Sequence, residues 1–171
     1  MSAGEFTRMV KLDRLPPELN IEADGDERAA LARRFGLPAV SALRARVALS
    51  QAGDAVEARG RLDAAFTQAC AISDEPFANT LSEPLAIRFV RFIAPGAEDE
   101  EQEFAAGEPD EIEYDGAAFD LGEAVAQSFG LALDPYATGP DAEAARHEAG
   151  LTDETAPSGP FAALAALKPK G

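Results

Sequence analysis

Hydrophobic and polar positions alternate along a central stretch that runs from Val40 to Ile93. A period of two is typical of strands that bury one face and expose the other. Turn-forming residues interrupt the alternation at Gln51–Asp54, Asp74–Pro76 and Ser82–Pro84. The pattern therefore predicts an antiparallel meander that forms most of a sheet.

Shorter segments flank this stretch. Apolar residues at even spacing predict a short strand near Phe6–Leu12, and alternation predicts a second over Leu19–Ala23. Ile112–Tyr114 is predicted as a further short strand. These segments extend the sheet at both ends of the meander.

A helix is predicted over Asp26–Phe35. The run Asp24-Gly25-Asp26 offers an N-cap, and apolar side chains follow at helical spacing. Gly36, which precedes Pro38, is a C-terminal stop signal.

A second helix is predicted over Leu121–Phe129, ending near Gly130. Asp120 and Glu123 have the spacing of a capping box, in which Asp120 accepts from a helical amide and Glu123 reaches back. Leu121, Val125 and Phe129 then share one helix face.

The chain of 171 residues is long enough for one domain. We expect a single α+β domain over residues 1–136, with two main helices and an antiparallel sheet that could close into a barrel. From 137 to 171 the composition offers little to bury, which predicts a weakly ordered tail. Phe161, Leu164 and Leu167 could form a short docking helix there.

Charge is distributed unevenly along the chain. Residues 1–93 carry 12 basic and 13 acidic side chains, whereas residues 94–171 carry 3 and 18. Glu98–Asp115 contains ten carboxylates and no cation. A segment that repels itself and has few apolar residues favours a mobile acidic loop, at about 96–111.

Few residues are suited to catalysis or metal binding. Cys70, the one cysteine, lies in a small apolar run and is expected to be buried, and the one histidine, His147, is expected to be solvated. Zinc and calcium spacings and a phosphate-binding glycine loop are missing from the sequence. We therefore predict no catalytic residue, metal or cofactor.

The formal net charge of −16 argues against nonspecific attraction to nucleic acid or to anionic membranes. No signal peptide or membrane-spanning run is evident, and one cysteine cannot form an internal disulfide. We expect a soluble, cytoplasmic protein with no membrane partner.

Two Arg-x-Arg pairs lie within the meander: Arg44 and Arg46, then Arg59 and Arg61. Side chains two positions apart on a strand share a face. A two-residue turn at Ala52-Gly53, or a four-residue loop over Gln51–Asp54, would pair Arg44 with Arg61 and Arg46 with Arg59. This register collects the apolar residues on the opposite face, whereas a slip of one residue would mix them.

Four like charges opposite one another oppose folding unless anions compensate them. Two interpretations stay open at this point. Solvent and the Glu98–Asp115 segment could screen a solvated face, or Arg44, Arg46, Arg59 and Arg61 could contact the phosphates of RNA.

An ordered set of short motifs resembles a known family. The set comprises the Glu27–Leu37 helix, a strand with x-G-x-L at Arg59–Leu62, Cys70 followed by Glu75 and Pro76, the acidic loop, Asp120-Leu121-Gly122-Glu123, Leu131–Tyr136 and Pro160–Leu164. Together they resemble the YceD family, named for large-subunit ribosomal RNA accumulation, and in particular its alphaproteobacterial form.

The resemblance implies a noncatalytic cytoplasmic factor in ribosome biogenesis, whose partner is large-subunit ribosomal RNA or a ribosomal protein. An alternative is an adaptor whose acidic segment binds a basic ribosomal protein without contacting RNA. Many family members have paired cysteines where this chain has only Cys70, so the resemblance implies no metal here.

Overall fold

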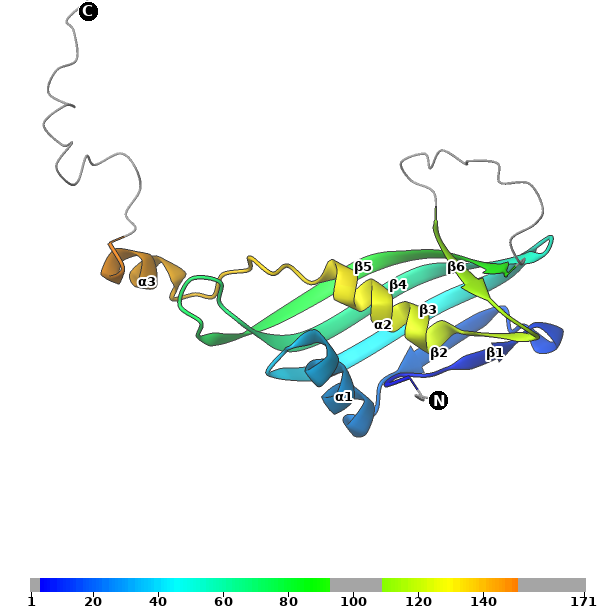
Figure 1. Cartoon of the computed structure of the whole chain (residues 1–171), viewed down its shortest axis with the longest axis horizontal. Coiled ribbons are helices and arrows are strands. Elements are labelled where there is room, and N and C mark those ends of the chain that lie inside the picture. The colour runs from blue at the N-terminus through cyan, green and yellow to red at the C-terminus, as the bar shows by residue number, and fades with distance from the viewer. Residues whose placement is uncertain (1–3, 93–108, 151–171) are drawn as a thin grey trace, which may run out of the picture.

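The computed structural model describes residues 4–92 and 109–150 (Figure 1). Its strands are β1 (Met9–Lys11), β2 (Glu18–Glu22), β3 (Ala39–Ala52), β4 (Ala55–Ala69), β5 (Pro76–Arg91), β6 (Asp110–Tyr114) and β7 (Ala118–Asp120). Its helices are the 3-10 helix η1 (Leu12–Arg14), α1 (Gly25–Phe35), α2 (Leu121–Ala132) and α3 (Ala142–Glu148). The predicted α+β class is confirmed.

The main sheet has five strands in the order β2-β3-β4-β5-β6. It is open, because β2 and β6 form separate edges, so the alternative of a closed barrel was wrong. The pairs from β2 to β5 are antiparallel as predicted, whereas β6 runs parallel to β5 over Ile87–Arg91. Parallel strands cannot be joined by a tight turn, and residues 92–109 separate β5 from β6 in the sequence.

The helices cover one face of this sheet. In Figure 1, α2 crosses the sheet diagonally, and α1 lies beside β3 at its lower edge. The predicted N-terminal strand does not extend the main sheet, so that expectation was wrong. Val10 of β1 pairs instead with Phe119 of β7 in a separate two-stranded sheet, whose side chains join the same core. One face of β2–β5 is therefore buried, and the other faces solvent.

Aromatic side chains link the layers of the core. Phe89 of β5 stacks on Phe119 of β7 with ring centroids 4.1 Å apart. Phe129 of α2 makes edge contacts at 5.5 Å with Phe35 of α1 and with Phe66 of β4. Burial of each such ring stabilises the fold by about 1.5–3 kcal/mol.

α1 begins at Gly25, one residue before its predicted start, and its N-cap is Asp24 of the predicted run. Glu27 completes a capping box that was not predicted. The Asp24 side chain accepts from the Glu27 amide at 2.9 Å, and the Glu27 carboxylate accepts from the Asp24 amide at 2.8 Å. Gly36 ends the helix in the left-handed conformation at φ 64°. Glycine adopts this conformation without steric cost.

α2 differs from its prediction at both ends. Asp120 accepts from the Glu123 amide at 3.2 Å, but Glu123 does not complete a capping box, because its carboxylate binds Arg34 instead. The helix also continues past Gly130 to Ala132. Gly130 is needed for packing, since an added Cβ would collide with the Phe35 ring.

The expected turn at Ser82–Pro84 was also wrong, because β5 continues through it. The ladder between β5 and β6 covers only Ile87–Arg91, so Pro76–Ala86 lies at an edge within the described part of the chain. Proline lacks an amide hydrogen but is tolerated on a sheet edge. Pro84 therefore sits opposite Arg61 without breaking the strand.

This edge carries few free hydrogen-bond donors. The backbone amide and carbonyl groups of successive residues point to opposite edges of a strand. Residues an even number of positions apart, such as Pro76, Thr80 and Pro84, therefore point these groups to the same edge. The two prolines have no amide hydrogen to offer, and the Thr80 amide donates to the Asn79 Oδ1 at 2.8 Å. Three of the outward positions are thus unable to donate to a further strand.

Some predictions fall partly or wholly outside the described residues. Positions 96–108 of the expected acidic loop and the docking helix of Phe161, Leu164 and Leu167 lie there. Asp110 and Glu111, at the end of the expected loop, belong to β6. Within the expected tail, α3 forms a third helix that buries Ala142.

Candidate functional site

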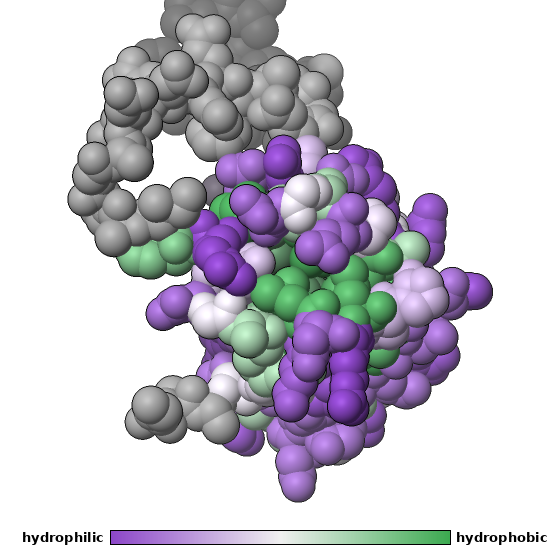
Figure 2. All heavy atoms as spheres, turned by 90° about the vertical axis from the view of Figure 1, so that its right-hand side faces the viewer, coloured by the Kyte–Doolittle hydropathy of each residue, from purple (hydrophilic) through white to green (hydrophobic). Residues whose placement is uncertain are grey.

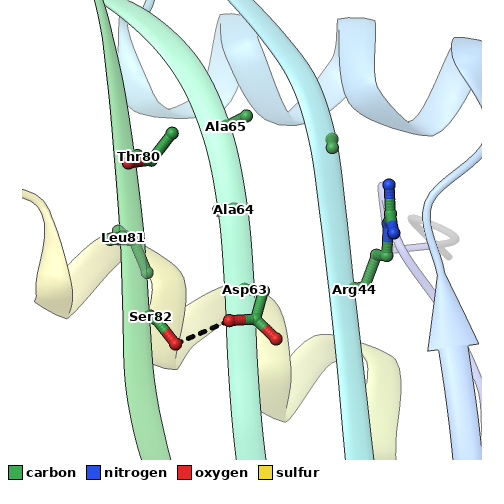
Figure 3. A pocket seen from close by; sticks show the side chains of 8 residues that line it. Arg44, Asp63, Ala64, Ala65, Thr80, Leu81 and Ser82 are labelled. Carbon is green, nitrogen blue, oxygen red and sulfur yellow. Dashed lines mark hydrogen bonds between the residues drawn. The ribbon is translucent and has the colours of Figure 1, made fainter.

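The four predicted arginines project from the solvent face of the sheet. We call this surface the open face; it comprises Arg44, Arg46, Arg59, Arg61, Asp63 and Ser82, with Glu18, Glu22 and Glu57 beside them. Figure 3 looks onto it, with the helices behind the strands. The side chains of Arg44, Arg46 and Arg59 are 65%, 73% and 61% exposed.

The register between β3 and β4 differs from the predicted one by two residues. Arg46 lies opposite Arg61, Arg44 opposite Asp63, and Arg59 opposite Ala48. The predicted pairs of Arg44 with Arg61 and of Arg46 with Arg59 were therefore wrong.

The turn explains this difference. Ala52 pairs with Ala55, so the two-residue turn is Gly53-Asp54 rather than Ala52-Gly53. Gly53 adopts a φ of 64°, which a β-hairpin turn requires at its first central position and which glycine permits. A shift of two residues leaves every side chain on its face, so the predicted division into an apolar and an arginine-bearing face holds.

Neighbouring side chains of the same sheet compensate the arginines. Arg44 pairs with Glu22 at 3.5 Å, Arg46 with Glu18 at 2.8 Å, and Arg59 with Glu57 at 3.3 Å. Arg61 donates to the Ser82 hydroxyl at 2.9 Å, which donates to Asp63 at 2.6 Å.

Exposed ion pairs of this kind contribute about 0–1 kcal/mol each. Because the cost of breaking them is small, an anionic ligand could replace the carboxylates at the arginines. The open face is thus balanced in charge but open to exchange.

A shallow depression lies at one side of the open face. It has a volume of about 460 Å³ and a floor of small residues that includes Ala42 and Ala65. Figure 3 shows Arg44 on one flank, with Asp63 and Ser82 joined by their hydrogen bond. The small side chains leave the sheet backbone accessible to a ligand.

A fifth arginine, Arg88 of β5, was missed from the sequence. It lies opposite Glu57 and contacts Glu111 of β6 at 3.8 Å. The signal was present, because Leu85, Ile87 and Phe89 alternate as buried residues and leave Arg88 on the other face.

Cys70, Glu75 and Pro76, predicted as family-motif residues, form the turn between β4 and β5. The Cys70 amide donates to the Glu75 carbonyl at 2.8 Å, and the Asp74 amide donates to the Cys70 carbonyl at 2.9 Å. Pro76 opens β5 opposite Ala69. The Ala71 amide donates to the Ala137 carbonyl at 3.0 Å, so the turn also anchors the segment that follows α2.

The Cys70 side chain is 3% exposed, which confirms the predicted burial, but polar groups surround its sulfur. The Ser73 hydroxyl is the main cause that lowers the pKa of the Cys70 thiol to about 7, with the Ser73, Gly139 and Ile72 backbones adding to it. Hydrogen bonds to a thiolate favour the ionised form. The turn therefore stabilises a charged sulfur in a position that is closed to solvent.

Asp120, Leu121, Gly122 and Glu123 join the two helices to the N-terminal strand. Asp120 caps α2 and also accepts from the Arg8 amide at 2.8 Å. Leu121 is fully buried. Gly122 lies against the backbone, because an added Cβ would be 2.5 Å from the Phe6 carbonyl oxygen. These contacts give the motif a structural role.

Two arginines clamp this region. Arg34 of α1 donates to Glu123 of α2 through both terminal nitrogens, at 2.9 and 2.7 Å. Arg8 does the same to Glu27 at 2.6 and 2.9 Å. These hydrogen bonds are the largest cause that lowers the pKa of Glu123 and of Glu27.

The geometry offers no arrangement for acid–base or metal chemistry within residues 4–92 and 109–150. No three His, Cys, Asp or Glu side chains in these ranges gather as metal ligands. His147 is exposed on α3. None of the helices described is long and apolar enough to cross a membrane.

The chain was compared with known proteins. A family model described as "Large ribosomal RNA subunit accumulation protein YceD" matches residues 58–168, which is more than half of the chain. The matched range covers two of the four open-face arginines, the Cys70 turn and all of α2. No curated protein matches, and no solved structure does.

Proposed function

We propose that this chain, which belongs to the family of large ribosomal RNA subunit accumulation proteins, YceD, acts by binding RNA through its open face and not by catalysis. A role in ribosome assembly would place it in the cytoplasm. The family description gives only involvement in the accumulation of large-subunit ribosomal RNA. Direct contact with that RNA would be the means.

One observation carries the proposal: Arg46 and Arg61 lie directly opposite each other on an exposed sheet face. Adjacent like charges oppose folding unless an anion compensates them, and the compensation here is weak and replaceable. Arg46 pairs with the exposed Glu18, and Arg61 reaches Asp63 only through Ser82. Phosphates of an RNA backbone are such anions, and arginine binds them through two parallel hydrogen bonds. Arg44 lies two residues before Arg46 on β3, and Arg59 lies two residues before Arg61 on β4, so both project from the same face.

The open face also suits RNA in shape. One side of the sheet is buried beneath α2, whereas the other has no helix across it in the described part of the chain (Figure 3). Several RNA-binding modules present an open sheet to single-stranded bases and phosphates.

The direct test is binding of a large-subunit ribosomal RNA fragment, measured by fluorescence anisotropy at several salt concentrations. The test variant carries Arg44→Gln, Arg46→Gln, Arg59→Gln and Arg61→Gln together. Each lost phosphate contact lowers the salt slope by somewhat under one unit, so we expect weaker binding and a slope reduced by up to about three units.

The matched control changes four exposed cations elsewhere: Lys11→Gln, Arg14→Gln, Arg33→Gln and Arg146→Gln. It has the same net charge as the test variant, so a general electrostatic effect would weaken both equally. Wild-type affinity and slope in the folded open-face variant would overturn the proposal.

A second candidate is an adaptor without RNA contact. It is favoured by residues 94–171, which carry 18 acidic and only 3 basic side chains and would attract a basic ribosomal protein. A pull-down of ribosomal proteins that survives nuclease treatment, together with unchanged RNA binding by the quadruple variant, would favour the adaptor.

A further inference from the structure

The open face continues beyond Arg59 to the end of β5, where its character changes. Side chains at alternate positions share a side of the strand, which places Arg88, Val90 and Phe92 in one row. The Phe92 amide continues the ladder by donating to the Tyr114 carbonyl at 2.8 Å. Phe92 is 48% exposed and is one of four large hydrophobic residues exposed in the described part of the chain.

A pocket lies beside this row, at the tip of the β3–β4 hairpin. Ala52, Asp54, Ala55, Arg88, Val90 and Arg91 line it, and its volume is about 300 Å³. We call it the hairpin-end pocket. Its lining combines three apolar residues with three charged ones. Figure 2 looks onto this end of the molecule, where hydrophobic atoms at the centre of the view have hydrophilic residues around them. An apolar area with a few charged groups at its rim is typical of ligand pockets.

Arg88 has an unused donor in this pocket. Its Nε is buried and has no hydrogen-bond partner among the described residues. The nearest carboxylate, Glu111, lies 3.8 Å from Nη1, too far for a hydrogen bond. A buried donor without an acceptor is costly. The Arg88 side chain as a whole is 43% exposed, so a ligand can reach it, and a turn of the guanidinium toward that ligand would give Nε the acceptor it lacks.

We propose that the hairpin-end pocket binds one nucleotide of a single-stranded RNA, with its phosphate at Arg88 and its base against Phe92 and Val90. The proposal rests on the proposed function and deepens it, because it assigns single-stranded RNA as the substrate class. A phosphate satisfies an arginine donor, and exposed aromatic rings stack unpaired bases.

The charges and spacing of the row support this assignment. Arg61, Arg59 and Arg88 lie on neighbouring strands along one direction of the open face, and residues two apart on a strand are about 7 Å apart. The cations thus form a track that ends at an aromatic ring. Asp54 at the pocket rim would accept from an amino group of the base.

The chain contains no tryptophan, which makes a direct test possible. Phe92→Trp introduces a single reporter that retains an aromatic face. The probe is a short single-stranded oligoribonucleotide of mixed sequence, added to the full chain. We expect saturable quenching of the tryptophan emission as a base stacks on it.

The matched control is Tyr136→Trp. Tyr136 is also exposed, at 81%, but it lies after α2 and is not part of the row of Arg88, Val90 and Phe92. We expect no quenching there. A duplex of the same sequence should quench neither variant, because its bases are already stacked.

Two further variants measure the contributions to affinity. Phe92→Ala removes the ring and should weaken binding of the oligoribonucleotide about tenfold, with Tyr136→Ala unchanged. Arg88→Gln should weaken it and lower the salt slope by about 0.7 unit, the value for one phosphate of a single strand. Both positions are at the surface, so thermal unfolding should stay close to that of the wild type.

The outcomes separate this inference from the proposed function. If the wild type binds RNA, Phe92→Ala binds it equally well and the emission of Phe92→Trp is not quenched, the nucleotide site is refuted and the proposed function stands. Quenching of Phe92→Trp by an acidic peptide but not by RNA would assign the pocket to a protein instead. If the wild type binds no RNA, the proposed function fails, and the nucleotide site fails with it.

Discussion

Gly122, in the first turn of α2, lies against the backbone of the segment that leads into β1: an added Cβ would be 2.5 Å from the Phe6 carbonyl oxygen and 2.7 Å from the Arg8 amide nitrogen. Backbone atoms cannot rotate away as a flexible side chain can. The N-terminal segment and α2 therefore approach as closely as they do because this residue has no side chain.

Gly122→Ala should consequently destabilise the protein, although alanine favours a helix by about 1 kcal/mol over glycine. We expect a loss of about 1–3 kcal/mol, as for overpacking of a core, measured by urea unfolding. The control is Gly25→Ala in the first turn of α1, where an added Cβ would meet only Arg28 at 4.0 Å. Equal stability of the two variants would contradict the close approach.

The clamps on Glu27 and Glu123 predict acid sensitivity. Both carboxylates have a pKa below the usual value, chiefly because Arg8 and Arg34 donate to them. A lowered folded-state pKa gives stabilisation that is complete above the unfolded value of about 4.3 and is lost as the pH falls through the folded value. Thermal stability should therefore fall below about pH 4.3.

Glu27→Gln and Glu123→Gln should each lower the unfolding free energy by about 1 kcal/mol at neutral pH, since the pairs are partly exposed. Each should also reduce the loss of stability below about pH 4.3. Glu143→Gln on α3 is the control, because Glu143 is exposed. If both test variants lose as much stability at acid pH as the wild type, the two arginine–glutamate pairs do not cause the acid sensitivity.

Cys70 predicts an effect at the other end of the pH range. Its pKa of about 7 lies below that of a free thiol, roughly 8.5, so its contribution to stability is complete above about 8.5 and is lost as the pH falls to about 7. The unfolding free energy of the wild type should thus rise between pH 7 and 8.5 relative to Cys70→Ala. Ultraviolet absorbance of the thiolate would report its pKa, which Ser73→Ala should raise.

Arg61→Gln tests the like-charge pair on the open face. It relieves repulsion from Arg46 and loses the hydrogen bond to Ser82. These effects oppose each other, so stability should be unchanged or slightly raised, within about 0.5 kcal/mol. Arg59→Gln relieves no such repulsion, because Arg59 lies opposite Ala48. Thermal unfolding that shows a marked loss for Arg61→Gln alone would contradict this account.

Helix positions were predictable where local chemistry decided them. Asp24 and Gly36 each act within one turn of the helix end, so the sequence was enough to place α1 to within one residue. Gly130 carries the same stop signal as Gly36, but its role is to make room for Phe35, which is far away in the sequence. A contact of that kind cannot be read from a local pattern.

The sheet shows a similar division. Alternation fixed which side chains face solvent, including all four predicted arginines, but it is unchanged by a shift of two residues. Only the turn conformation at Gly53 selects between Arg46 and Arg44 as the partner of Arg61. The compensation by Glu18 and Glu22 depends instead on the pairing of β2 with β3. These strands are joined through α1 and not by a hairpin turn, so no local turn signal indicates their register.

The edge of β5 bears on how partners can approach this protein. An exposed strand invites another polypeptide to extend the sheet, and this route underlies many chain-to-chain associations and much unwanted aggregation. With Pro76, Pro84 and the Asn79-capped Thr80 along that edge, a visiting strand would find few donors to pair with. The RNA contact proposed above needs no such pairing, so this edge would favour one type of polymer over another: it discourages strand addition by proteins and leaves the open face beside it exposed.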